Sequence, residues 1–168
     1  NFSVINDNNA NKVAVDFKKL NGTVENFQIK GPNIKGDISS LRMQTQWGVN
    51  VENLQTQFSM TKKSMDLKSL FFKTPYTNIE GSIAMRYPEG GLKDFTTKVQ
   101  MTVDFKKSKI ATKDLKKFYN EFADNQIIYL NALAQGSLNT FKVYNAKLQT
   151  SNSAEFVGQV ALENLFDK

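Results

Sequence analysis

The stretch "TTKVQMTVDF", residues 96–105, decides the fold class of this chain. Val99, Met101, Val103 and Phe105 alternate in it with Lys, Gln, Thr and Asp. Successive side chains of a β-strand point to opposite faces of the sheet, so this alternation gives one apolar face and one polar face. The stretch therefore predicts a strand of an antiparallel sheet that meets apolar material on one side and water on the other.

The same alternation continues outward from this stretch in both directions. Turn-forming residues such as Gly31-Pro32-Asn33 and Ser151-Asn152-Ser153 separate the alternating runs. We expect a mainly β fold of about ten antiparallel strands. The clearest runs are "KVAVDFKKL" (12–20), "NLQTQFSM" (53–60), "TNIEGSIAMRY" (77–87) and "EFVGQVALENL" (155–165).

One pattern of Gly, Thr or Ser, and spaced apolar residues occurs twice. Residues 22–29 read "GTVENFQI" and residues 136–143 read "GSLNTFKV". We interpret the two copies as structural repeat units of a single domain over residues 1–168, with related halves at roughly 1–90 and 91–168. Asn21-Gly22 suits a type I′ hairpin turn, which we predict before the first copy.

One segment breaks the two-residue period. In "ATKDLKKFYNEFADN" (111–125) the apolar residues recur at helical spacing, and Thr112 is a suitable N-cap. We expect one helix over about residues 112–124, whose apolar stripe caps the apolar face of the sheet. The alternative is that this stripe binds a partner. The stripe consists of Leu115, Phe118, Tyr119 and Phe122.

The composition excludes several kinds of catalytic and metal site. The chain has no His and no Cys, so the usual zinc sites and the Ser-His-Asp and Cys-His mechanisms are excluded. Ser59 and Lys62 have the spacing of a Ser-x-x-Lys pair, but enzymes that use this pair place it on a helix, and here it lies in strand-like sequence. We therefore predict no enzyme activity, no catalytic residue, no metal site and no cofactor.

The charge of the chain is basic, with 22 Lys and Arg against 16 Asp and Glu. Six of the lysines fall between residues 106 and 117, where they form either a solvated face or a contact for phosphates or anionic lipid headgroups. No nucleic-acid motif and no interleaved aromatic residues accompany them, so no nucleic-acid partner is predicted.

The order of elements in the second half resembles the AsmA-like superfamily, and within it the TamB-type envelope proteins of Bacteroidota. The resemblance is carried by "KSKIATKDLKKFYNEF" (107–122) and then "NALAQGSLNTFKVYNAKLQTSNSAEFVGQVALENL" (131–165). Asp114-Leu115 matches the family's short helix, and Gly136 to Val143 and Phe156 to Leu162 match strands that follow it. Residues 77–83 repeat the closing element at 154–160.

The resemblance implies a β-groove, an open half-pipe of stacked antiparallel strands that is apolar inside and polar outside. It implies a periplasmic, non-enzymatic conduit that shields phospholipid acyl chains between the inner and outer membranes and supports outer-membrane biogenesis and protein secretion. It also implies an inner-membrane anchor and an outer-membrane β-barrel partner. Because the sequence begins with Asn1, we expect a fragment of a longer chain or a processed product, with the anchor outside it.

Alternation alone leaves two other folds open. A closed β-sandwich would use the same residues to fill its core and serve as a binding or adhesive module, and a closed carrier would enclose one ligand. In the groove interpretation Met101 lies in an open furrow, where a carboxylate in its place would stay hydrated. The residues expected to line that groove are Val13, Val15, Phe17, Leu54, Phe58, Met60, Ile79, Ile83, Met85, Val99, Met101, Val103, Phe105, Leu138, Phe141, Val143, Phe156, Val160 and Leu162.

Overall fold

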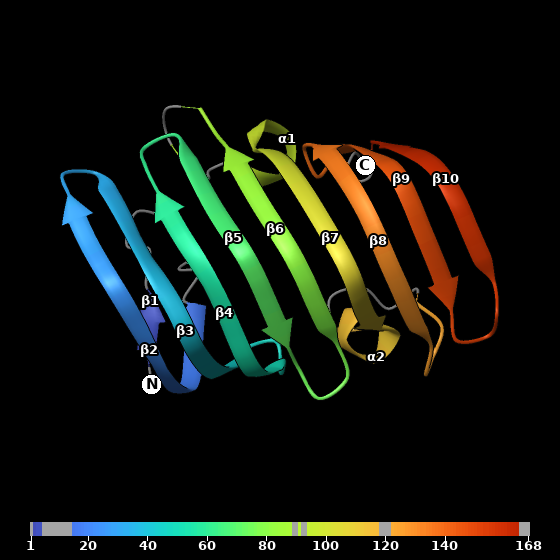
Figure 1. The fold of residues 1–168 in the computed structure, drawn as a ribbon, viewed down its shortest axis with the longest axis horizontal. Helices are drawn as coiled ribbons and strands as arrows, with labels where there is room; N and C mark the ends of the chain where they lie inside the picture. Colours follow the sequence, from blue (N-terminus) through green and yellow to red (C-terminus); the bar gives the residue numbers. More distant parts are fainter. Residues whose placement is uncertain (1, 5–14, 89–90, 92–93, 118–121, 165–168) are drawn as a thin grey trace, which may run out of the picture.

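A computed structural model shows one antiparallel sheet in which the strands follow each other in chain order from β1 to β10 (Figure 1). The structure describes residues 2–4, 15–88, 91, 94–117 and 122–164. Within these residues each strand pairs only with its neighbours in the sequence, and the sheet is not closed into a barrel. The strands are β1 (Phe2–Val4), β2 (Val15–Lys30), β3 (Asn33–Thr45), β4 (Asn50–Met60), β5 (Ser64–Lys73), β6 (Asn78–Arg86), β7 (Gln100–Ala111), β8 (Ile127–Gly136), β9 (Thr140–Thr150) and β10 (Glu155–Glu163).

The predicted antiparallel β fold is confirmed, but the helix is much shorter than expected. α2 covers only Thr112–Leu115, where a helix to about residue 124 was predicted. A second helix, α1 (Phe95–Lys98), was not predicted, and it precedes the strand that contains Met101. Lys116 and Lys117 form a turn after α2, and residues 118–121 lie outside the described residues. Helical periodicity alone predicts helix length poorly in so short a segment. The first turn of a helix is costly to form, so the pattern does not ensure that the whole segment is helical.

Most of the predicted turns are confirmed, but the one at Asn21-Gly22 is wrong. Gly31-Pro32 joins β2 to β3, with Gly31 at a φ of 57°. Asn21 and Gly22 instead lie within β2, opposite Arg42 and Leu41. A Cβ on Gly22 would lie 2.6 Å from the Ser40 carbonyl oxygen, so close approach of β3 explains this glycine rather than a turn.

The two copies of the Gly-Thr/Ser pattern are not structurally equivalent. Residues 22–29 lie entirely within β2, whereas residues 136–143 run from the last residue of β8 through a loop into β9. The other internal similarity does correspond in the structure, because Asn78 and Glu155 are the first residues of β6 and β10. Gly81 and Gly158 then take the same place in these two strands.

β-Bulges repeat across the sheet at a fixed spacing. Ser69 in β5, Lys107 in β7 and Asn145 in β9 each have a φ of 50°, and each lies where the register shifts. They are 38 residues apart (107 − 69 = 38 and 145 − 107 = 38). A bulge bends its strand and increases the local twist. The regular structural unit in this part of the sheet is therefore a hairpin of about this length.

Candidate binding face of the sheet

A row of apolar residues crosses nine strands in register. Residues that are directly opposite each other in paired strands lie on the same face of the sheet. We call this row the methionine row because it contains four of the five methionines of the chain. It consists of Ile29, Ile34, Met60, Met65, Met85, Met101, Gly136, Phe141 and Leu162.

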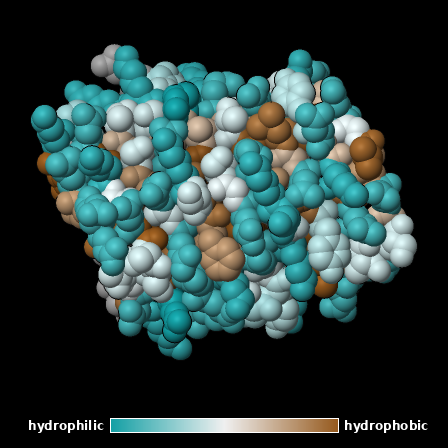
Figure 2. Space-filling view, in the orientation of Figure 1, coloured by the Kyte–Doolittle hydropathy of each residue, from teal (hydrophilic) through white to brown (hydrophobic). Residues whose placement is uncertain are grey.

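The neighbouring row on the opposite face is polar apart from two alanines. Figure 2 shows one side of the molecule, on which hydrophilic residues predominate and hydrophobic residues are scattered among them. The two rows are one residue apart on every strand, so the sheet has an apolar face, which carries the methionine row, and a polar face. The polar row consists of Gln28, Lys35, Ser59, Asp66, Ala84, Thr102, Gln135, Lys142 and Ala161.

The apolar face is exposed at its two ends and covered in the middle. Ile29 on β2 is 62% exposed and Leu162 on β10 is 38% exposed, but Met101 between them is only 8% exposed. Tyr87 and Val99 are buried with Met101 in one cluster, against which Phe95 of α1, Leu138 and Phe141 pack. The expectation that Met101 lies in an open furrow is therefore wrong, because α1 and the loop after β8 cover it.

Most of the predicted lining residues do lie on the apolar face. Two of them are outside the strands: Val99 directly precedes β7, and Leu138 lies in the loop between β8 and β9. Val13 is outside the described residues, and for Val15 the structure gives the pairing with Val4 only. Those that the strands place on the apolar face are Phe17, Leu54, Phe58, Met60, Ile79, Ile83, Met85, Met101, Val103, Phe105, Phe141, Val143, Phe156, Val160 and Leu162.

The sequence reasoning missed the part of the apolar face that is most exposed. Phe27 and Ile29 on β2 were assigned to a repeat motif rather than to the groove, and Val24 lies beside them. The bulge at Asn26, where φ is 51°, interrupts the alternation there. Phe27 nevertheless reaches Phe58 on β4, with ring centroids 6.5 Å apart across Gly36. Gly36 was the sequence signal that could have indicated this contact, because a glycine between two aromatic residues leaves space for their rings to meet.

Polar contacts attach α2 to the turn between β5 and β6. The Thr74 hydroxyl donates a 2.5 Å hydrogen bond to Asp114 Oδ2, and both residues are buried. Lys117 Nζ lies 3.4 Å from Asp114 Oδ1, which is an ion-pair distance without a hydrogen bond.

Only two of the four residues of the expected apolar stripe lie in the described part of the chain. Leu115 is half-buried, Phe122 is 37% exposed in a bend, and Phe118 and Tyr119 fall outside the described residues. The capping of the groove by this stripe therefore stays a prediction.

Four of the six clustered lysines have partners within the chain. Lys106 is paired with Asp104, Lys116 with Asp124 and Lys117 with Asp114. Lys113 lies over the ring of Tyr76, 4.1 Å from its centroid. These contacts are spread between β7 and the segment after α2, which favours a solvated surface over a phosphate site.

The described residues can be compared with the requirements of a metal site and of a Ser-x-x-Lys pair. They contain no group of three or more carboxylates that could hold a metal ion. Ser59 lies in β4 on the polar face, and Lys62 follows in the turn after that strand. None of the helices in the described part of the chain is long and apolar enough to cross a membrane.

No family model, no curated protein and no solved structure matches the chain.

Proposed function

We propose that the apolar face is a lipid-binding groove, and that the protein is a non-enzymatic segment of a conduit that shields phospholipid acyl chains. The observation that carries this proposal is the methionine row, which crosses nine strands without a second sheet over it among the described residues. An acyl chain requires apolar surface and no catalytic group, and the apolar face offers accessible surface at its two ends. Large contiguous apolar patches on a protein surface usually mark an interaction site.

The two exposed ends of the face support a conduit over a closed core. A filled sandwich would need a second sheet packed about 10 Å from the first, whereas the described residues form one unclosed sheet. The ends at Ile29 and Leu162 are exposed, while the middle is covered by Phe95 and Leu138. Lipid contact is therefore most accessible on β2 and on β10.

The cellular setting of this proposal comes from the resemblance to TamB-type envelope proteins. We propose a periplasmic segment of a Gram-negative envelope protein, with its inner-membrane anchor in sequence outside these residues. In this setting it moves phospholipid between the membranes and supports outer-membrane biogenesis and protein secretion, next to an outer-membrane β-barrel partner.

Site-specific photo-crosslinking tests the groove. A photoreactive amino acid replaces either Ile29 on the apolar face or Gln28, its neighbour on the polar face. The purified chain is irradiated with vesicles of phosphatidylethanolamine and phosphatidylglycerol, and lipid adducts are measured by mass spectrometry. We expect adducts at position 29 and at least tenfold fewer at position 28.

The matched positions make the result decisive, because they differ by one residue and face opposite sides of the same strand. Equal adducts at both positions would indicate unspecific contact with vesicles, and none at position 29 would contradict a lipid groove. Native mass spectrometry of the purified chain gives a second measurement, in which co-purified phospholipid is the expected result.

A further inference from the structure

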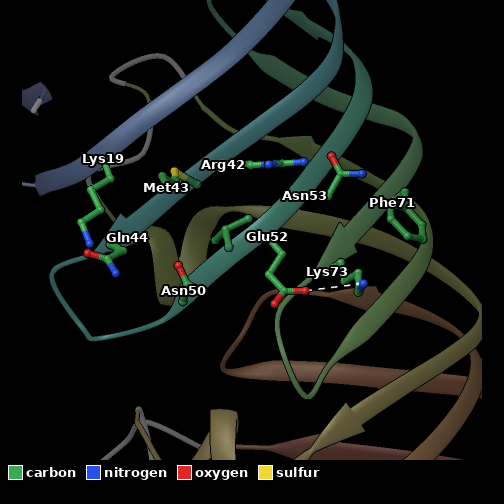
Figure 3. Close-up of a pocket in the computed structure, with 10 residues that line it drawn as sticks. Lys19, Arg42, Met43, Gln44, Asn50, Glu52, Asn53, Phe71 and Lys73 are labelled. Atoms are coloured by element: carbon green, nitrogen blue, oxygen red, sulfur yellow. Dashed lines mark ion pairs between the residues drawn. The ribbon is translucent and has the colours of Figure 1, made fainter.

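A separate cavity opens on the polar face, away from the proposed lipid groove. It measures about 620 Å³, within the usual range of small-molecule sites. Figure 3 shows its side chains, which come from β2, β3, β4 and β5. The cavity is lined by Lys19, Arg42, Met43, Gln44, Asn50, Val51, Glu52, Asn53, Phe71 and Lys73.

Two bulges meet at this point and hollow the face. Between Lys18 and Asn21, β2 has two residues opposite Met43 alone, and Lys19 takes a φ of 52°. On the other side of β3, Glu52 and Asn53 both lie opposite Arg42, because Leu41 pairs with Leu54 and Met43 with Val51. Bulges often redirect side chains beside binding sites, and a non-glycine residue at positive φ has an energetic cost that a functional role can explain.

The cavity contains three cations, of which one is paired with a carboxylate among the described side chains. Glu52 is paired with Lys73, with Oε2 and Nζ 3.5 Å apart. Among the side chains that the structure describes, no carboxylate lies within ion-pair distance of Lys19 or Arg42. Figure 3 shows Arg42 extending from β3 toward Asn53. A guanidinium without a carboxylate partner is suited to bind a carboxylate or phosphate of a ligand, through two parallel hydrogen bonds.

The remaining polar groups favour hydroxyl groups as partners. Three amides, those of Gln44, Asn50 and Asn53, line the cavity. Asn53 Oδ1 is shielded from solvent and has no hydrogen-bond partner among the described residues. An amide can donate and accept at once, as a sugar hydroxyl does. The Phe71 ring supplies an apolar surface within the same cavity.

We propose that this cavity binds an acidic sugar, meaning a saccharide that carries a carboxylate or a phosphate. Arg42 and Lys19 bind the anionic group, and the amides of Gln44, Asn50 and Asn53 bind the hydroxyls. This site is independent of the lipid groove, because its polar lining residues lie on the other face of the sheet.

Isothermal titration of the purified chain tests the site with defined probes. Trigalacturonate and glucose 6-phosphate supply the two kinds of anionic sugar, with galactotriose as the neutral sugar and inorganic phosphate as the anion alone. We expect one of the acidic sugars to bind at least tenfold more tightly than galactotriose and inorganic phosphate. Arg42→Gln and Lys19→Gln should each weaken that binding about tenfold or more.

Arg86→Gln is the matched control, since Arg86 is an arginine outside the cavity whose Nη1 lies 2.7 Å from Asp66. It should leave the affinity unchanged. The proposal is overturned if neither acidic sugar binds, or if galactotriose or inorganic phosphate binds as tightly as they do. It is also overturned if both cavity variants, shown to be folded by circular dichroism, keep full affinity. Lipid adducts at position 29 depend on neither cavity residue, so the two proposals fail separately.

Discussion

At the scale of single residues, two glycines are required by the backbone that approaches them. Gly136 has a φ of 134°, and a Cβ built on it would lie 2.0 Å from the Thr140 carbonyl oxygen. Gly81 has a φ of 153°, with the Asp104 carbonyl oxygen 1.9 Å from the same position. Both contacts are with backbone atoms, which cannot move aside as a flexible side chain can.

We therefore expect Gly136→Ala to lower the free energy of unfolding by about 2 kcal/mol or more, because strain at such a backbone conformation adds to the clash. Gly158→Ala is the control. Its nearest atoms are in the Phe156 ring at 3.1 Å, and a side chain can adjust. Urea denaturation of both variants measures the difference. Equal losses would show that close backbone approach is not what requires Gly136.

Met101 provides a second test at this scale. Its side chain is 8% exposed in the cluster with Tyr87 and Val99. Met101→Asp would place an unpaired carboxylate there, so we expect a loss of about 3 kcal/mol or more, or failure to fold. Thr102→Asp, on the exposed polar face, should change the stability by less than about 0.5 kcal/mol. A Met101→Asp variant with the thermal stability of the original chain would show that this part of the groove is open to water.

The face of each residue could be predicted from the sequence, but its exposure could not. Alternation assigned Phe58, Ile83 and Val103 to one face, and the strand pairing agrees. Met101 has the same pattern as these residues and is covered by Phe95 and Leu138, which come from segments outside the strands that the period does not describe. The cavity around Arg42 could not be predicted either, because it depends on two bulges that meet across three strands.

At the scale of elements, α2 illustrates how a short segment is fixed by a tertiary contact. Four residues cannot form a stable helix by themselves. The Thr74 hydroxyl accepts hydrogen bonds from the backbone N–H groups of Tyr76 and Thr77 and donates one to Asp114. One threonine thus joins the turn between β5 and β6 to a helix 40 residues later. The sequence pattern predicted a helix from about residue 112, but its N-cap assignment was wrong, because Ala111 is the N-cap and Thr112 is the first helical residue. The end at Leu115 was not predicted either, because the helical period carries no information about this contact.

We expect Asp114→Ala to lower the free energy of unfolding by about 2 kcal/mol. A hydrogen bond to a charged group is lost, and the buried Thr74 hydroxyl is left without an acceptor for its proton. Asp124→Ala is the control, because Asp124 is paired with Lys116 at an exposed position. Its effect should be within about 0.5 kcal/mol. Thermal melting followed by circular dichroism compares the two. A similar small effect for both would mean that the buried contact does not hold α2 in place.

At the scale of the whole molecule, both outer strands offer unpaired edges. In the described part of the chain, β1 pairs with β2 only at residues 15–17, and β10 pairs with β9 alone. Apolar side chains are exposed near both edges of the sheet, among them Ile29 on β2 and Val157 on β10. Edge strands of this kind pair readily with other chains unless charged residues or a cover prevent it. The same continuity that makes a groove therefore also makes the sheet prone to association.

We expect the isolated chain to self-associate through these edges as its concentration rises from micromolar to millimolar values. Val157 is 70% exposed on β10, so Val157→Lys should reduce association without lowering the melting temperature. A lysine at this position disfavours edge pairing, because a second chain would have to bury its charge. Gln159→Lys adds the same charge to the same strand where the side chain is already polar. Sedimentation equilibrium of the three proteins measures the effect. If Gln159→Lys reduces association as much as Val157→Lys does, net charge is responsible rather than the apolar edge. If the unaltered chain remains monomeric throughout, the exposed edges do not pair, and the open ends of the apolar face are available to lipid alone.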